Sequence, residues 1–219
     1  MRPSGRNEWR TARMQVETTI AADTPPFPKP GRHPGFSSFK TIRPILYPAR
    51  WHRDLLIQAT LDPAIEAIGQ VFGAEAGRDE LNLDLILGGT RVLVAAMHDG
   101  DGRLLQERRP GAVVLAKSTV LAEPRAADAR AVWATRGLAV QPGDRLRILI
   151  ASEDGGSHPI RELAACVRHP DADPFETVLS LVCRGDLLID MKDGLQPEAG
   201  IRRRVSARDT VELFPDRRL

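Results

Sequence analysis

Two adjacent glycines, Gly88 and Gly89, separate two strand-like runs and constrain the fold of this chain more than any other feature. Glycine accepts the positive φ that a two-residue hairpin turn requires, so the pair predicts a β-hairpin. The first run, 81–87, alternates around Asp84, which is typical of a strand with one buried face. The second run, 92–97, is apolar throughout, as expected of a central strand covered on both faces.

The other patterns alternate between helical and strand-like spacing, which predicts an α/β fold. Asp62 followed by Pro63 is typical of a helix start, because aspartate caps free N–H groups and proline fits the first helical turn. Gly137 is placed to end a helix, and the next strand would then return to the same sheet by a crossover. The expected elements are helices over 48–59, 62–72 and 125–136, and strands over 112–115 and 146–151.

The last third of the chain predicts a compact helical end. A helix over 159–167 and a helix over 175–184 are separated by a break, and Gly185 ends the second helix. Two strand-like runs follow, over 187–189 and 201–205. Two helices followed by a two-stranded ribbon is the order of a small winged-helix unit.

Residues 1–40 contain many prolines and glycines and no sustained apolar periodicity. Proline lacks a backbone donor and biases the residue before it toward extended conformations, so the stretch 24–35 cannot be helical. We therefore expect an arm over 1–40, an α/β core over 41–155 and a helical, winged-helix-like part over 156–219.

Basic residues gather near both ends of a chain whose net charge is only +2. The first 53 residues contain ten Lys or Arg against three Asp or Glu, which suits contact with phosphates or with an acidic partner, and equally fits a solvated arm. Trp9 and Phe36 are aromatic residues of the arm that could stack on bases or wedge between them. The basic residues of the arm are Arg2, Arg6, Arg10, Arg13, Lys29, Arg32 and Lys40.

Six further arginines are candidates for DNA contact. Three flank the first predicted helix and three lie on the predicted ribbon; they are Arg43, Arg50 and Arg53, and Arg202, Arg203 and Arg204. Arginine contacts to phosphate give an affinity that is nonspecific and sensitive to salt. On the ribbon, the same charges equally fit an edge strand that is protected from pairing with another chain.

The cysteines and the apolar runs bear on the compartment. Cys166 and Cys183 form no Cys-x-x-Cys pair and lie in apolar, helix-like stretches, so each is expected to be a small buried residue in a reducing compartment. No apolar run approaches the roughly 20 residues of a membrane span, and the N-terminus lacks the order of a signal peptide. We expect a cytoplasmic protein that does not contact membranes, and the many Arg and Ala residues favour a bacterial source.

The order of these motifs resembles the TnsA-type endonuclease subunit of heteromeric cut-and-paste transposons, over about residues 40–205. Ala49-Arg-Trp-His-Arg-Asp-Leu55 and the following Leu61-Asp-Pro63 are similar to an early helix of that family, and Leu83-Asp84-Leu85 to its Pro-Asp-Phe. Further similar positions are Gln70, 133–138 and 179–190. The resemblance implies a restriction-endonuclease-like mixed sheet with flanking helices, and DNA as a partner.

The resemblance also implies a metal site, which this chain retains only in part. Such nucleases hold Mg²⁺ with carboxylates and place a lysine beside them. Asp84 matches one ligand, but His52 stands where the early helix carries Glu, and the strand 91–98 contains neither an acidic residue nor Lys. One carboxylate is a poor Mg²⁺ site, so a cofactor is expected only if the protein is active, as Mg²⁺ or Mn²⁺. His52 and His98 could instead join Asp84 around a softer ion such as Zn²⁺ or Mn²⁺.

A second segment contains the residue types of a nuclease site. Asp190-Met-Lys192 is an Asp-x-Lys tripeptide after a predicted strand, and Asp186 or Asp173 could supply a second carboxylate. The tripeptide is short and common by chance. No Gly-x-Ser-x-Gly, phosphate-loop or dinucleotide-binding motif is present.

Three functions remain open at this point. The leading one is a non-catalytic DNA-binding or assembly factor that positions a partner recombinase, transposase or ATPase on DNA, the partner being what the resemblance implies. The second is a divergent metal-dependent endonuclease that uses Asp84. The third is a protein-interaction adaptor that never contacts nucleic acid.

Overall fold

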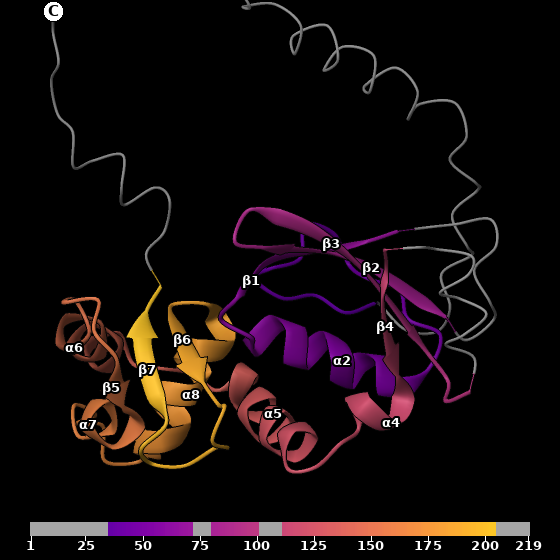
Figure 1. The fold of residues 1–219 in the computed structure, drawn as a ribbon. Helices are drawn as coiled ribbons and strands as arrows, with labels where there is room; N and C mark the ends of the chain where they lie inside the picture. Colours follow the sequence, from indigo (N-terminus) through magenta and orange to yellow (C-terminus); the bar gives the residue numbers. More distant parts are fainter. Residues whose placement is uncertain (1–34, 72–79, 101–110, 205–219) are drawn as a thin grey trace, which may run out of the picture. The chain divides into compact units, whose positions relative to one another are not determined.

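The computed structural model describes residues 35–71, 80–100 and 111–204, which all lie in the unit that begins at Gly35. Most of the predicted arm, including Trp9, lies outside the described residues. The unit is an α/β fold with a four-stranded mixed sheet, flanking helices and a second, three-stranded sheet (Figure 1).

The four-stranded sheet runs in the order β1-β2-β3-β4. Its strands are β1 (Ile65–Gln70), β2 (Leu81–Leu87), β3 (Thr90–Met97) and β4 (Val113–Ala116). The first three are antiparallel, and β4 pairs in parallel with β3. The predicted hairpin is confirmed: Gly88 and Gly89 form its turn, with φ of 55° and 73°.

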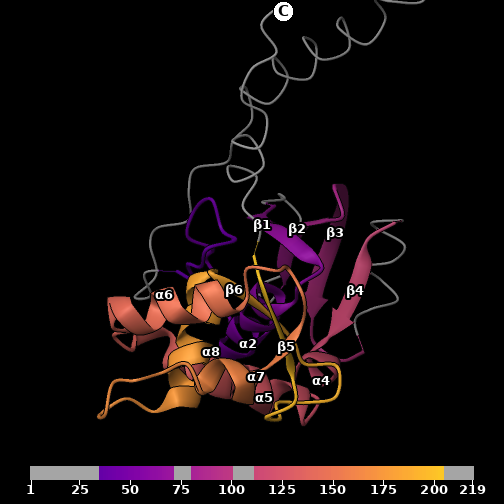
Figure 2. The ribbon, with the colours of Figure 1, turned by 90° about the vertical axis from the view of Figure 1, so that its left-hand side faces the viewer.

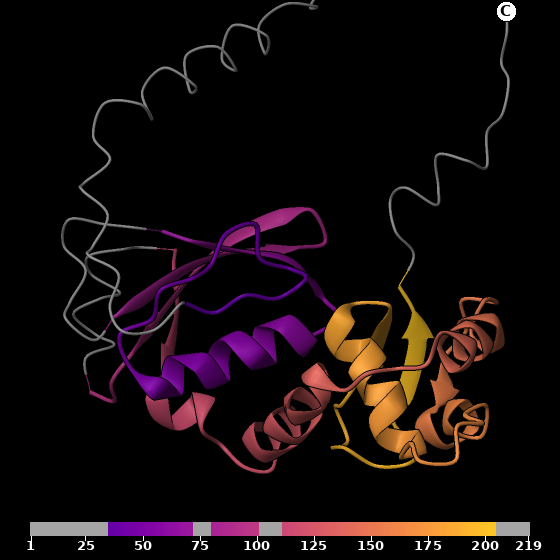
Figure 3. The same cartoon turned by 180° about the vertical axis from the view of Figure 1, so that it is seen from behind.

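The helix α2 (Arg50–Leu61) lies along one face of this sheet, and α5 (Arg125–Ala134) lies beyond it (Figure 3). Leu81, Leu83 and Leu85 of β2 are buried and belong to the same core as the buried residues of α2. Because side chains alternate along a strand, Asp84 projects from the opposite face of β2.

The prediction of a helix over 62–72 is wrong, since β1 occupies this segment. The register of β1 shifts between Ile65 and Ala67, and this bulge places Ile65 and Ile68 opposite Leu87 and Leu85. A bulge adds one residue to a strand, so two buried isoleucines three positions apart imitate helical spacing. Pro63 lies in the turn before β1 rather than in a helix.

The edge of β1 is covered by the chain that precedes α2. Thr41 forms a parallel bridge with Ile68, whose N–H donates to the Lys40 carbonyl at 2.9 Å. The Gln70 side chain acts as a further backbone-like partner for Leu46: its Nε2 donates to the Leu46 carbonyl at 2.6 Å, and its Oε1 accepts from the Leu46 N–H at 3.0 Å.

The prediction of a strand over 146–151 is also wrong, because α6 (Pro142–Ala151) is a helix with proline in its first turn. Asp144, Ile148 and Ser152 recur every four residues and are the buried positions of this segment. Leu146 and Ile150 are 60% and 54% exposed, so the apolar run does not mark a buried strand. No crossover to the four-stranded sheet occurs here.

Two α-helices lie between β4 and α6. The short α4 (Lys117–Val120) was not predicted. The helix predicted over 125–136 is confirmed as α5, followed by the 3₁₀ turn η1 (Thr135–Gly137). Gly137 lies inside that turn and does not take the positive φ of a glycine cap.

The C-terminal elements follow the predicted order. They are β5 (His158–Pro159), α7 (Ile160–Ala164), α8 (Pro174–Arg184), β6 (Leu187–Asp190) and β7 (Gly200–Arg203). The strands form an antiparallel sheet in the order β5-β7-β6, so the predicted ribbon gains a third, short strand (Figure 2).

The helix α8 is capped at both ends; the end at Gly185 was predicted, whereas the cap at Asp173 was not. Asp173 accepts a hydrogen bond from the Glu176 N–H at 2.9 Å, Pro174 lies at the first helical position, and Gly185 ends the helix with φ of 81°. A Cβ on Gly185 would lie 2.5 Å from the ring of Phe39, so this glycine also makes room for a neighbour.

The last residues of the predicted arm are part of the core instead. Phe36 is 4% exposed and stacks on Trp133 of α5, with ring centroids 5.2 Å apart. Lys40 is also 4% exposed. Phe36 therefore has no free face for a base, and Lys40 does not reach solvent.

Both cysteines are free thiols; Cys183 is buried and Cys166 is half-buried. None of the described helices combines the length and the apolar character that crossing a membrane requires.

Candidate functional site

Asp84 is held by an arginine from the neighbouring strand. Nε of Arg91 lies 2.7 Å from both carboxylate oxygens of Asp84, and Nη2 lies 2.6 Å from Oδ2. On the other side, Gly69 of β1 pairs with Asp84 and brings no side chain near it. Both oxygens of the predicted ligand are therefore engaged by a guanidinium, which a cation would have to displace.

The two histidines lie around Trp51 rather than around Asp84. His52 is fully buried, and its Nδ1 accepts a hydrogen bond from the Ala49 N–H at 3.2 Å, at the first turn of α2. Its ring lies 3.8 Å from that of Trp51, while His98 meets Trp51 edge-on at 5.8 Å. Among the described residues, no three His, Cys, Asp or Glu side chains are placed to share a metal ion. Asp84, His52 and His98 are thus not brought together.

The Asp190-Met-Lys192 tripeptide does not gain the carboxylates proposed for it. Asp186 accepts two hydrogen bonds from Arg145, both at 2.9 Å, and Asp173 caps α8. Asp190 instead accepts the Lys192 N–H at 3.1 Å, with the Lys192 ammonium 3.5 Å away.

The six candidate arginines share one property: none forms an ion pair with a described residue. Six other described arginines do, as Arg161 does with Glu198 at 2.5 Å, whereas Arg136, Arg168 and Arg184 also have no ion pair with a described residue. An arginine without a carboxylate partner keeps its charge available for a phosphate. The six lie in two groups, one near the start of α2 and one at the end of β7, where Arg204 directly follows the strand.

In the first group, Arg43 and Arg50 are exposed and Arg53 is half-buried. Arg50 and Arg53 lie in the first turn of α2, and Arg43 lies in the preceding loop beside Ile42, which is 88% exposed.

In the second group, Arg202 and Arg203 are exposed on β7. The Arg204 guanidinium lies 4.9 Å from the ring centre of Phe39, in a cation–π contact. The second group therefore offers two arginines to solvent and one fixed against an aromatic ring.

Lys40 lies close to Arg204 of the second group; it was predicted as a basic residue of the arm, but its burial was not predicted. Its Nζ donates to the Asp62 carbonyl at 2.5 Å, at the C-terminal end of α2. Burial lowers the pKa of Lys40 to about 8, the Asp62 carboxylate opposes this, and the nearby charge of Arg204 adds to it. No pattern in the sequence distinguishes this lysine from the other basic residues of the segment 1–40.

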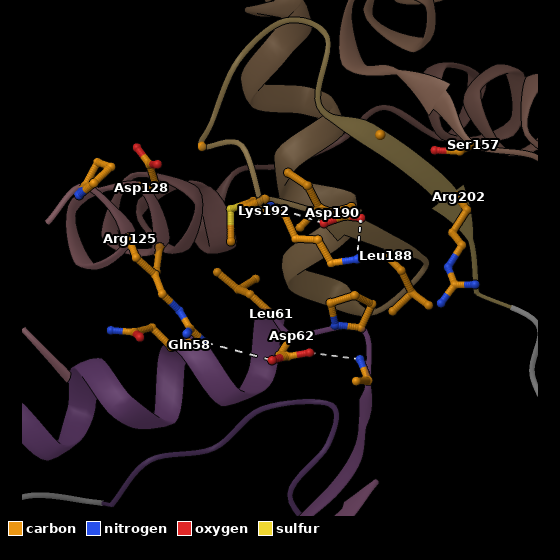
Figure 4. A pocket seen from close by; sticks show the side chains of 18 residues that line it. Gln58, Leu61, Asp62, Arg125, Asp128, Ser157, Leu188, Asp190, Lys192 and Arg202 are labelled. Carbon is orange, nitrogen blue, oxygen red and sulfur yellow. Dashed lines mark hydrogen bonds and ion pairs between the residues drawn. The ribbon is translucent and has the colours of Figure 1, made fainter. Parts of the chain in front are cut away.

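A pocket of about 850 Å³ opens beside β7 (Figure 4). It is lined by the end of α2, the turn that follows it, the start of α5, and β6 and β7. Its apolar wall contains Leu61, Pro63, Leu188 and Met191. Its lining residues come from five separate segments of the chain, around 58–64, 124–129, 157, 188–194 and 200–202, so no local sequence motif predicts the pocket.

The charged side chains that line the pocket differ in whether they have a partner. Asp62 accepts the Ala64 N–H at 2.9 Å and lies 3.9 Å from Arg125, and Asp128 accepts the Leu195 N–H at 3.0 Å. Arg202 also lines the pocket and has no carboxylate partner within the described ranges.

No family model matches this chain, no curated protein matches it, and no solved structure matches it. The resemblance to the TnsA-type family therefore stays a prediction.

Proposed function

We propose that this protein binds duplex DNA without cutting it and positions a partner protein there, such as a transposase, a recombinase or an ATPase. The observation that carries the proposal is that all six candidate arginines lack carboxylate partners within the described part of the chain. Duplex DNA presents about one negative charge per 1.7 Å of its axis, so such arginines supply affinity through phosphate contacts.

The fold supports the finer prediction of a restriction-endonuclease-like core followed by a winged-helix-like part. The mixed sheet with α2 against one face suits the former. The order α7, α8, β6, β7 suits the latter, with β7 as the wing that reaches the DNA backbone. In this arrangement Arg202 and Arg203 contact phosphates from the wing.

The non-catalytic part of the proposal is supported by the contacts of Asp84 and His52. The Asp84 carboxylate is neutralised by Arg91, and His52 completes a helix start inside the core. Both oxygens of Asp84 are thus occupied, and His52 offers ring nitrogens rather than the oxygen ligands that Mg²⁺ prefers.

The decisive experiment is fluorescence anisotropy with a labelled duplex over a range of salt concentrations. The unmodified protein should bind at low salt, and the double variant Arg202→Ala/Arg203→Ala should bind more weakly on every sequence. Each lost phosphate contact should reduce the slope of log K against log salt by about 0.9. Arg161→Ala is the matched control, because Arg161 is an exposed arginine already paired with Glu198. No binding at low ionic strength would end the proposal.

The other two functions give different results in simple assays. Nicking of a plasmid in Mn²⁺ that disappears in Asp84→Ala would establish the divergent endonuclease. Capture of a partner protein by a chain that binds no DNA probe would establish the adaptor.

A further inference from the structure

The pocket beside β7 has features that phosphate contacts alone do not explain. Its volume, about 850 Å³, falls within the range of about 300–1,000 Å³ that is usual for sites enclosing a small molecule. Arg202 lines it from β7, directly opposite Leu188 of β6 in the strand register. A ligand bound by Arg202 would therefore also contact the apolar side chain of Leu188.

The apolar wall suits a flat ring system. Leu61 and Pro63 come from the end of α2 and the turn after it, while Leu188 and Met191 come from β6 and the residue that follows it. A base taken out of its stack loses contact with its neighbours, and apolar side chains can replace that contact.

The charges suit a ligand that has an anionic end and a hydrogen-bond donating end. Figure 4 shows Arg202 on β7 and Asp128 on α5 at opposite sides of the pocket. One oxygen of Asp128 accepts the Leu195 N–H, and the other has no hydrogen-bond partner within the described ranges. A carboxylate is the natural acceptor for the exocyclic amino group of a base.

We infer that this pocket receives one unpaired nucleotide of a DNA strand. The phosphate binds Arg202, the base lies against Leu188 and Met191, and Asp128 accepts from the amino edge of the base. The inference rests on the proposed DNA binding and deepens it, because a base inside a duplex cannot reach the pocket. The ligand is thus a strand end, a gap or an extruded base.

The test compares two labelled probes by anisotropy: a blunt duplex, and the same duplex with a short unpaired extension on one strand. Burial of one base against the apolar wall, together with the contact between its phosphate and Arg202, should make the extended probe bind about tenfold more tightly. Ala64→Trp fills the pocket from an exposed turn position, and should remove this preference while the affinity for the blunt duplex stays within about twofold.

Ala139→Trp is the matched control, because Ala139 is exposed and does not line the pocket. It should keep the preference for the extended probe. Thermal unfolding of both variants checks that they fold.

Each outcome separates the two proposals. Equal affinity for the two probes, or a preference that survives in Ala64→Trp, overturns the inference and leaves the duplex binding intact. Binding of the extended probe alone, lost in Ala64→Trp, supports the pocket and overturns binding to the duplex. Absence of binding to either probe at low salt overturns both.

Discussion

The guanidinium of Arg91 lies across both carboxylate oxygens of Asp84, on the face of the sheet opposite to α2. Arg91 comes from the partner strand of the hairpin, seven residues later in the chain. Asp84, the residue predicted as a nuclease ligand, is therefore compensated by a charge that the hairpin itself supplies.

This pair should add little to stability. The Arg91 side chain is 73% exposed, and ion pairs of this kind contribute about 0.2–1 kcal/mol. We expect Asp84→Ala and Arg91→Ala each to lower the free energy of unfolding. The effect of the double variant should equal the sum of the two single effects to within about 1 kcal/mol. Urea unfolding measures this, and a coupling well above that value would show that the pair is structural.

Because Lys40 is buried, the free energy of unfolding should change with pH in the alkaline range. Its pKa in the folded protein is about 8, below the usual value of 10.5, so between these values the unfolded chain binds more protons than the folded one. The free energy of unfolding should therefore rise with pH across this window, by at most about 1.4 kcal/mol per pH unit, relative to Lys40→Met. Below pH 8 the cost of the buried charge is fully present.

The measurement is urea unfolding of both proteins from pH 7 to pH 10. Lys192→Met is the matched control, since Lys192 is 85% exposed and its replacement should shift the curve without changing its shape. Parallel curves for Lys40→Met and the unmodified protein would contradict the assignment.

The two thiols should differ in reactivity. Burial raises the pKa of Cys183 to about 11, and its Sγ donates to the Val132 carbonyl at 3.2 Å, whereas Cys166 is half-buried. Since the thiolate is the reactive form, a chromogenic disulfide at pH 8 should label Cys166 first and Cys183 only on unfolding. Cys166→Ser should remove the fast phase and Cys183→Ser should not. Equal rates for both thiols would rule out the buried position of Cys183.

Gly185 should tolerate alanine much less than a glycine of similar backbone conformation. Both Gly185 and Gly155 have positive φ, but a Cβ at Gly185 would meet the Phe39 ring, and one at Gly155 would meet nothing within 4 Å. Gly155→Ala should cost about 1–2 kcal/mol, and Gly185→Ala about 1–3 kcal/mol more. Thermal unfolding compares them, and Phe39→Ala should relieve the additional loss in Gly185→Ala.

The elements that depend on neighbours in sequence were predictable. The turn at Gly88 and Gly89 and the caps of α8 each involve residues within a few positions of one another, so their patterns are local. The strand β1 was not predictable, because its bulge is set by pairing with β2 and gives Ile65 and Ile68 a helical spacing.

The segment of α6 was predicted as a strand, and this prediction was wrong because an apolar run does not show which of its residues are buried. Its apolar run, 146–150, resembles a buried strand, but the buried positions are set by what lies against the helix, and Leu146 and Ile150 face solvent. Burial by tertiary contacts cannot be read from a run of apolar letters alone.

Of the candidate site, only the run of arginines could be predicted from the sequence. The arginines on β7 are visible as a run in the sequence, whereas the pocket beside them combines residues from α2, α5, β6 and β7. The burial of Lys40 has the same origin, since it depends on the end of α2 and on Arg204, both distant in the chain.

The amide of Gln70 and the backbone of Leu46 close the β1 edge of the four-stranded sheet, because they occupy groups that another polypeptide would otherwise pair with. Within the described sheet, an incoming strand could add only beside β4, which is four residues long. This architecture thus resists polymerisation through its larger sheet, because the edge that is closed cannot serve as a template for another chain.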